Sequence, residues 1–109
     1  MNLIELKRIL DTTGLPVTYS HWTSTSTNPV PPPPYICYLV DNDPHFMADN
    51  KVYMKISDVN IELYTNKKDL AAEAKIEKAL DDYEIPYVSS EAFIDSEKLF
   101  QKFYEVRLI

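Results

Sequence analysis

A thiol and two imidazoles are the first side chains of this sequence that could do chemistry. Cys37 is the single cysteine, and His21 and His45 are the two histidines. A catalytic thiol needs a base that lowers its pKa and a third group that orients the base. Cys37 stands inside the apolar stretch YICYLV, which favours a buried, unreactive thiol. Since the sequence offers no orienting group, a hydrolase using Cys37 and a histidine is the weakest of three functional hypotheses.

The acidic segment DNDPHFMADN, residues 41–50, is a candidate for binding calcium. An EF-hand loop that began at Asp41 would need an oxygen ligand at position 45, glycine at 46 and glutamate at 52. The chain has His45, Phe46 and Val52 at these positions. The three mismatches favour a solvated loop of turn-forming residues. We therefore predict no metal site, and no cofactor either.

Motifs that bind phosphates or nucleotides are absent from the sequence. With the single glycine Gly14, the chain lacks the P-loop and the dinucleotide fingerprint, which each need several glycines. HExxH and CxxC are absent as well. The acidic cluster of Asp81, Asp82 and Glu84 falls at a predicted helix end, where it opposes the helix dipole slightly and suits a cation or a partner. We predict that the protein is not an enzyme.

Composition and charge narrow the class of protein further. The chain has 109 residues, of which 45% are hydrophobic, so it can bury the core of a single domain, 1–109. No apolar run approaches the roughly 20 residues of a membrane span, and the charged start at Glu5, Lys7 and Arg8 is unlike a signal peptide. The net charge of −6 disfavours tight binding to nucleic-acid phosphates. We expect neither a membrane nor a nucleic-acid sequence as partner, whereas eight tyrosines suit protein contacts.

Apolar residues at helical spacing predict two helices. Residues 2–13 carry one apolar stripe, and Gly14 marks the end of that helix. Residues 66–84 form the second helix, with Thr65 or Asn66 as its cap. Its predicted inward side consists of Leu70, Ala74, Ile76, Leu80 and Tyr83.

Strands are predicted at residues 17–22, 35–40, 52–65, 87–94 and 98–109. In 52–65 the apolar residues change face at residues 57–58, which indicates a bulge, a turn between two strands, or one strand that exchanges faces. Because neither glycine nor proline stands there, we favour one long strand, bulged or face-switching. The order α-β-β-β-α-β-β predicts an α+β fold, a single mostly antiparallel β-sheet with two helices packed on it. The predicted shared core consists of Val59, Ile61, Leu63, Leu70, Leu80, Tyr104, Val106 and Leu108.

Two long loops are predicted, at residues 23–34 and 41–50. The first ends in four consecutive prolines, which fix the backbone and remove hydrogen-bond donors. A stiff lead-in to the next strand is preferred over a ligand for a proline-binding domain. Because loops of this length in a compact domain are usually functional or mobile, we expect protein contacts there. The candidate contact residues are Trp22, Pro31, Pro32, Pro33, Pro34, His45, Phe46 and Met47.

Two segments carry a resemblance to a known family: VNIELYTNKKDLAAEAKIEKAL at 59–80 and EKLFQKFYEVRLI at 97–109. They are similar to the small tail-completion, or tail-terminator, proteins of long-tailed bacteriophages and prophages of Gram-positive bacteria. In that family a strand ending in the ELYT type, a Lys/Asp-rich turn and an amphipathic helix precede two C-terminal strands. The N-terminal helix and the strand YICYLV fit the same layout, so the resemblance covers most of the chain. Its motifs are structural and not catalytic.

The resemblance implies an α+β subunit that assembles as a ring, usually a hexamer, on the head-proximal end of the tail tube. There it would end tube growth and offer a surface to the head connector, or stopper, protein. The implied partners are copies of the same chain, the tail-tube protein and the head connector. The implied location is the virion, after assembly in the cytoplasm of the host bacterium.

The main alternative is a small ligand-binding regulatory domain, because α+β folds of this size often sense small molecules. Measurement of the size of the particle separates the two hypotheses. A ring, or an assembly that depends on the tail tube, favours the phage protein. A monomer or dimer that a ligand stabilises favours the sensor.

Overall fold

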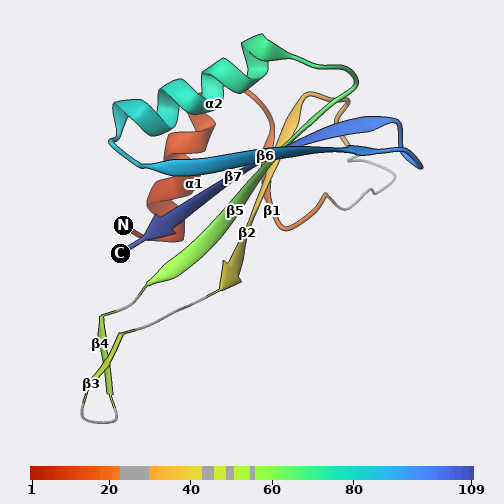
Figure 1. Cartoon of the computed structure of the whole chain (residues 1–109). Helices are drawn as coiled ribbons and strands as arrows, with labels where there is room; N and C mark the ends of the chain where they lie inside the picture. Colours follow the sequence, from red (N-terminus) through yellow and green to blue (C-terminus); the bar gives the residue numbers. More distant parts are fainter. Residues whose placement is uncertain (23–29, 43–45, 49–50, 55) are drawn as a thin grey trace.

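Two helices lie on one face of a five-stranded β-sheet (Figure 1). The structure, a computed structural model, describes residues 1–22, 30–42, 46–48, 51–54 and 56–109, and only the backbone of residues 42, 46–48 and 51–54. In chain order the elements are α1 (Leu3–Asp11), β1 (Val17–Tyr19), β2 (Tyr35–Asn42), β3 (Phe46–Ala48), β4 (Lys51–Met54), β5 (Ser57–Thr65), α2 (Leu70–Asp82), β6 (Tyr87–Ile94) and β7 (Leu99–Leu108).

The five-stranded sheet has the order β1-β2-β5-β7-β6. β2 pairs antiparallel with β5, β5 with β7 and β7 with β6, whereas the short β1 runs parallel to β2. The predicted fold class, α+β with two helices on a mostly antiparallel sheet, is therefore confirmed. β3 and β4 form an additional two-stranded sheet that the sequence did not predict.

The core lies between the helices and the central strands β5 and β7. Alternate residues of a strand point to the same face, and on these two strands the apolar residues alternate with polar ones. Ile61 stands opposite Tyr104 in the register, and both are fully buried. Seven of the eight predicted core residues are buried: Val59, Ile61, Leu63, Leu80, Tyr104, Val106 and Leu108. Leu70 is the exception, with 69% of its surface exposed.

α1 agrees with its prediction because its start and stop signals are local. The side-chain oxygen of Asn2 accepts a hydrogen bond from the backbone N–H of Glu5 at 2.9 Å, which caps the first turn. Gly14 follows the helix with φ +79°, a conformation that residues with a side chain rarely adopt. Leu6 and Leu10 are fully buried beneath the helix.

α2 starts four residues later than predicted. Thr65 is still part of β5, where it pairs with Phe100, and the helix cap is Asp69, whose carboxylate accepts the N–H of Ala72 at 3.0 Å. Leu70 and Ala74 lie on the exposed side of the helix, and Tyr83 follows its last residue and is exposed as well, so their assignment to the inward side was wrong. The buried side consists of Ala72, Glu73, Ile76, Ala79 and Leu80.

The single long strand predicted for residues 52–65 was also wrong. β4 pairs with β3 in the two-stranded sheet, whereas β5 belongs to the five-stranded sheet. The change of apolar face at residues 57–58 therefore marks the beginning of a strand in a different sheet. Within the predicted loop 41–50, β2 continues through Asn42 and β3 begins at Phe46.

The other strands are close to their predictions. β6 has the predicted ends, and β7 is shorter than predicted by one residue at each end. β1 ends at Tyr19 and not at residue 22, because the next residue, Ser20, has φ +65° and leaves the extended conformation.

The two-stranded sheet of β3 and β4 projects from the body of the subunit (Figure 1), and we call it the arm. It is inserted between β2 and β5, which are antiparallel neighbours, and so leaves the sheet at the end of that pair. The Cα radius of gyration is 15.2 Å, above the roughly 13 Å typical of 100 residues, and the long axis measures 48 Å. In its described residues the subunit is therefore a compact body from which the arm extends.

Candidate protein-contact surfaces

Strand β6 forms the longer of the two edges of the five-stranded sheet. One side of β6 pairs with β7, and in the described part of the chain no strand pairs with its other side. Natural edge strands are usually short, bulged, or protected by charges and prolines. β6 has eight residues, with Glu91 as its one charge, and it exposes Val88 by 70% and Phe93 by 48%. Such an edge is open to the addition of a further strand.

A pocket of about 350 Å³ lies between the base of the arm and the start of β6. Asp41 and Asp58 line it from the side of the arm, and Tyr87 lines it from β6. Arg107 contacts Asp58 with two hydrogen bonds, Nε to Oδ1 at 2.8 Å and Nη2 to Oδ2 at 3.0 Å. This interaction lowers the pKa of Asp58, so its carboxylate stays ionised beside the pocket.

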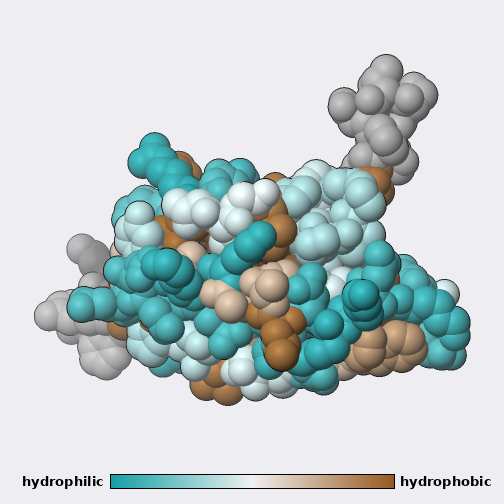
Figure 2. Space-filling model, turned by 90° about the horizontal axis from the view of Figure 1, so that it is seen from above, coloured by the Kyte–Doolittle hydropathy of each residue, from teal (hydrophilic) through white to brown (hydrophobic). Residues whose placement is uncertain are grey.

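The helix side of the subunit is mainly hydrophilic. Figure 2, seen from above the helices, shows hydrophobic residues in separate patches among hydrophilic ones. Ile4 of α1 and Leu70 of α2 are exposed by 66% and 69%. Single exposed hydrophobic residues are normal on monomeric proteins, so this surface gives no specific indication of a partner.

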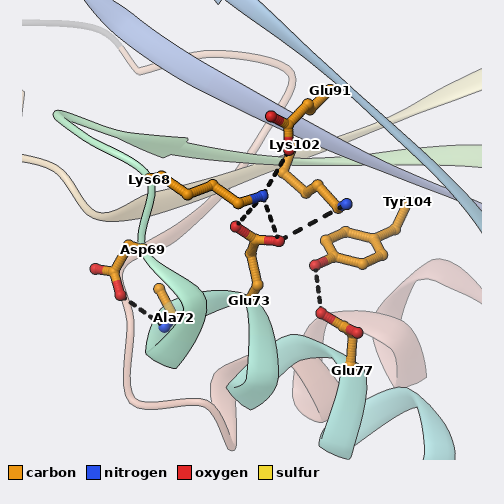
Figure 3. A network of polar contacts seen from close by, with 8 residues as sticks. All are labelled: Lys68, Asp69, Ala72, Glu73, Glu77, Glu91, Lys102 and Tyr104. Carbon is orange, nitrogen blue, oxygen red and sulfur yellow. Dashed lines mark hydrogen bonds and ion pairs between the residues drawn. The ribbon is translucent and has the colours of Figure 1, made fainter.

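The buried Glu73 connects α2 to the sheet (Figure 3). Its carboxylate forms an ion pair with the ammonium group of Lys68, with Oε2 at 2.9 Å from Nζ. The other oxygen, Oε1, lies 3.7 Å from Nζ of Lys102 on β7. Lys68 also contacts Glu91 of β6 at 2.6 Å. One turn further along α2, Glu77 accepts a hydrogen bond from the hydroxyl of Tyr104 at 3.0 Å. These contacts hold the edge strand and its neighbour against the helix.

Replacing Glu73 by alanine is expected to lower the free energy of unfolding by about 1–3 kcal/mol. The change leaves Lys102, whose side chain is 21% exposed, without its carboxylate partner. Urea unfolding followed by circular dichroism measures the loss. Asp82→Ala is the matched control, since it removes the exposed ion pair with Lys78 from the same helix and should change stability little. Equal effects of the two changes would contradict a structural role for the buried pair.

A hydrogen-bonded row of polar side chains crosses the sheet face opposite to the helices. Gln101 donates to the hydroxyl of Tyr64 at 2.8 Å, and this hydroxyl donates to Glu62 at 3.0 Å. The side-chain amide of Asn60 also donates to Glu62, at 3.2 Å. Burial raises the pKa of Glu62, although the Tyr64 hydrogen bond acts in the opposite direction.

The raised pKa of Glu62 predicts a pH-dependent effect of Glu62→Gln. A carboxyl group whose pKa is higher in the folded state stabilises the fold below its ordinary pKa of 4.5 and loses that contribution as the pH rises through the folded value. The stability of Glu62→Gln relative to the natural chain should therefore increase between about pH 4 and pH 7. Thermal unfolding across this range measures the difference, and a constant difference would contradict it.

Cys37 lies on the same sheet face, beside Glu62. Its surface is 3% exposed, and burial, with the nearby charge of Glu62, raises the pKa of the thiol to about 11. The predicted buried thiol is thus confirmed. His21 is exposed and lines the same pocket as Cys37, a space of about 310 Å³, while its Nδ1 lies 3.1 Å from Oγ of Ser20. A base is therefore close, but the environment opposes formation of the thiolate.

The predicted contact residues fall into two groups at opposite ends of β2. Trp22 and the four prolines 31–34 precede β2, and Trp22 is partly buried with its ring against Tyr35 at 6.0 Å between centroids. Phe46 and Met47 belong to the arm, beyond the other end of β2, and His45 lies outside the described residues. Eight residues of extended strand span roughly 26 Å, so the two groups are not one surface. Whether they contact another protein stays a prediction.

Sequence reasoning did not find the most exposed contact candidate, the free side of β6. The segment was predicted as a strand, but the sequence pattern does not reveal which strand ends at the edge of a sheet. The row Asn60, Glu62 and Tyr64 was missed as well, although its alternation with apolar residues was visible in the sequence. Gln101 stands opposite Tyr64 on the neighbouring strand β7. Because β7 is distant in the sequence, this partner was not predictable from β5 alone.

Two further observations concern the described part of the chain. No three or more His, Cys, Asp or Glu side chains are grouped there in a way that could hold a metal ion, and Asp43, His45 and Asp49 fall outside it. Neither described helix has the length and apolar character that crossing a membrane requires.

Comparisons with models of known protein families and with curated proteins give no match to this chain.

Proposed function

We propose that this chain is a subunit of a ring that ends the growth of a bacteriophage tail tube and joins the tail to the head connector. The observation that carries the proposal is the arm of β3 and β4, which extends beyond the compact body of the subunit. A two-stranded sheet is marginally stable by itself in water, so an extended one suits a contact with a neighbouring subunit. The resemblance of residues 59–80 and 97–109 to tail-terminator proteins names the kind of assembly.

The charge of the chain suits a ring through which DNA passes. Six subunits with a net charge of −6 each would carry about −36 in total. Carboxylates that face a central channel repel the phosphates of DNA and keep the duplex from adhering. The same repulsion opposes association of free subunits, so a chain that is monomeric in dilute solution can still form a ring on the tail tip.

Deletion of the gene from the phage or prophage that encodes it tests the proposal. We expect filled heads and separate tails in electron micrographs, with tails that are abnormally long or unable to join. Expression of the natural chain from a plasmid should restore infectious particles. Normal particles from the deletion strain would refute the proposal.

The alternative function, binding of a small regulatory ligand, has one observation in its favour. The pocket of about 310 Å³ beside Cys37 is lined by Trp22, Tyr35 and Tyr64, and its volume lies at the lower limit of ligand sites. The indole Nε1 of Trp22 is buried and has no hydrogen-bond partner among the residues that the structure describes. A small molecule that raises the melting temperature of the natural chain but not of Trp22→Ala would support this alternative.

A further inference from the structure

We propose that the arm of one subunit adds to the free side of β6 in a second copy of the chain and extends its sheet. This inference rests on the proposed function, because it names the contact that would join neighbouring subunits of the ring. It assigns one role to two features that are incomplete among the described residues: a two-stranded sheet to which no third strand is added, and an edge strand that has no outer neighbour.

The arm has the composition of a strand pair that becomes covered. Of its seven strand residues, six are hydrophobic: Phe46, Met47, Ala48, Val52, Tyr53 and Met54. Strand pairs become stable when a third strand or a packed surface covers them. A partner strand would stabilise the arm, and the described part of the body does not supply one, since neither arm strand pairs with the five-stranded sheet.

β6 is long enough to pair with a whole strand of the arm, and its charge is opposite to that of the arm. Its eight residues span roughly 26 Å, about twice the length of the four residues of β4. Lys51 is the one charged residue of the arm strands, and Glu91 is the one charged residue of β6, so their charges are opposite. Val88 and Phe93 are exposed on alternate faces of β6, so an added strand would find an apolar neighbour on each face.

The geometry of the single subunit directs the arm to another copy. The arm continues from β2 and β5, and β7 separates β5 from β6 in the sheet order. In Figure 1 the arm points away from the sheet, whereas β6 is an edge strand of the sheet and lies beneath α2. Because arm and edge are different surfaces of one chain, their contact is head-to-tail, and such contacts generate rings when the rotation closes. Pairing of β6 with β6 of a second copy would instead close a dimer and leave both arms uncovered.

Disulfide cross-linking between differently marked subunits tests the contact. In a Cys37→Ser background, one preparation carries Tyr53→Cys in the arm, and others carry a cysteine at Ser89, Ser90 or Ala92 of β6. After mixing and mild oxidation, we expect cross-linked dimers when an arm variant and an edge variant are present together. We expect no such dimers when either variant is oxidised alone. Chains that carry both cysteines should give a ladder of linked subunits. Lys75→Cys, on an exposed position of α2, is the control partner for the arm and should not cross-link.

A second variant separates this inference from the proposed function. Residues 46–54 are replaced by a two-residue turn, and retention of the melting transition shows that the body still folds. If this variant fails in tail completion while arm and edge cysteines do not cross-link above the α2 control, either in solution or on isolated tails, the proposed function stands and the arm-to-β6 contact is refuted. If the cysteines cross-link but deletion of the whole gene leaves normal particles, the contact stands and the phage function is refuted.

Discussion

Leu80→Ala is expected to lower the free energy of unfolding by about 2–5 kcal/mol, the usual cost of truncating a fully buried leucine. Leu80 has no exposed surface and belongs to the buried side of α2. Its carbonyl oxygen also accepts the N–H of Ile85 at 2.9 Å, where the chain turns at Glu84 with φ +56°. The side chain thus fills the core at the place where the helix ends. Urea unfolding at constant pH measures the change.

The control for Leu80 is a second leucine in the same helix. Leu70 is 69% exposed, so Leu70→Ala should change the free energy of unfolding by less than about 0.5 kcal/mol. The sequence alone predicted that both leucines were inward. A loss below about 1 kcal/mol for Leu80→Ala, or equal losses at both positions, would show that the orientation of α2 is wrong.

The sequence predicted the strands of the body because their pattern is local. In β7, for example, Tyr104, Val106 and Leu108 alternate with the polar residues Glu105 and Arg107, and this alternation marks the buried face of the strand. The start of α2 was predicted wrongly because Thr65, Asn66 and Asp69 are all suitable helix caps. What decides between them is the pairing of Thr65 with Phe100, a contact between residues far apart in the chain.

The arm was missed because its boundary carries no local signal. Neither glycine nor proline stands at residues 55–58, and β4 and β5 have similar β-branched and apolar composition. The two strands differ in their pairing partners. β4 pairs with β3, whereas β5 pairs with both β2 and β7. Pairing partners are a property of the whole topology, and a single sequence pattern does not contain them.

The contact surfaces were predicted only in part for the same reason. Glu73 falls among charged residues of a helix and looks solvent-exposed in the sequence, but its burial depends on Lys68 and on Lys102 of a distant strand. Likewise, β6 becomes an edge only because β7 folds back between it and β5. The predicted contact residues Phe46 and Met47 belong to the arm for which we propose an intersubunit contact, whereas Trp22 packs against Tyr35 of its own chain.

The thiol of Cys37 is expected to react with a thiol reagent at pH 8 at least roughly a hundredfold more slowly in the folded chain than in urea. The rise of its pKa from 9.0 to about 11 lowers the thiolate fraction at pH 8 by about that factor, and the 3% exposure restricts access further. Absorbance of the released reagent measures the rate. Ser90→Cys in a Cys37→Ser background is the control, because position 90 is exposed on β6 and should react quickly. A folded Cys37 that reacted as fast as this surface thiol would have an ionisable, accessible sulfur beside His21. That result would restore the hydrolase hypothesis, since a nucleophile and a base would then share one pocket.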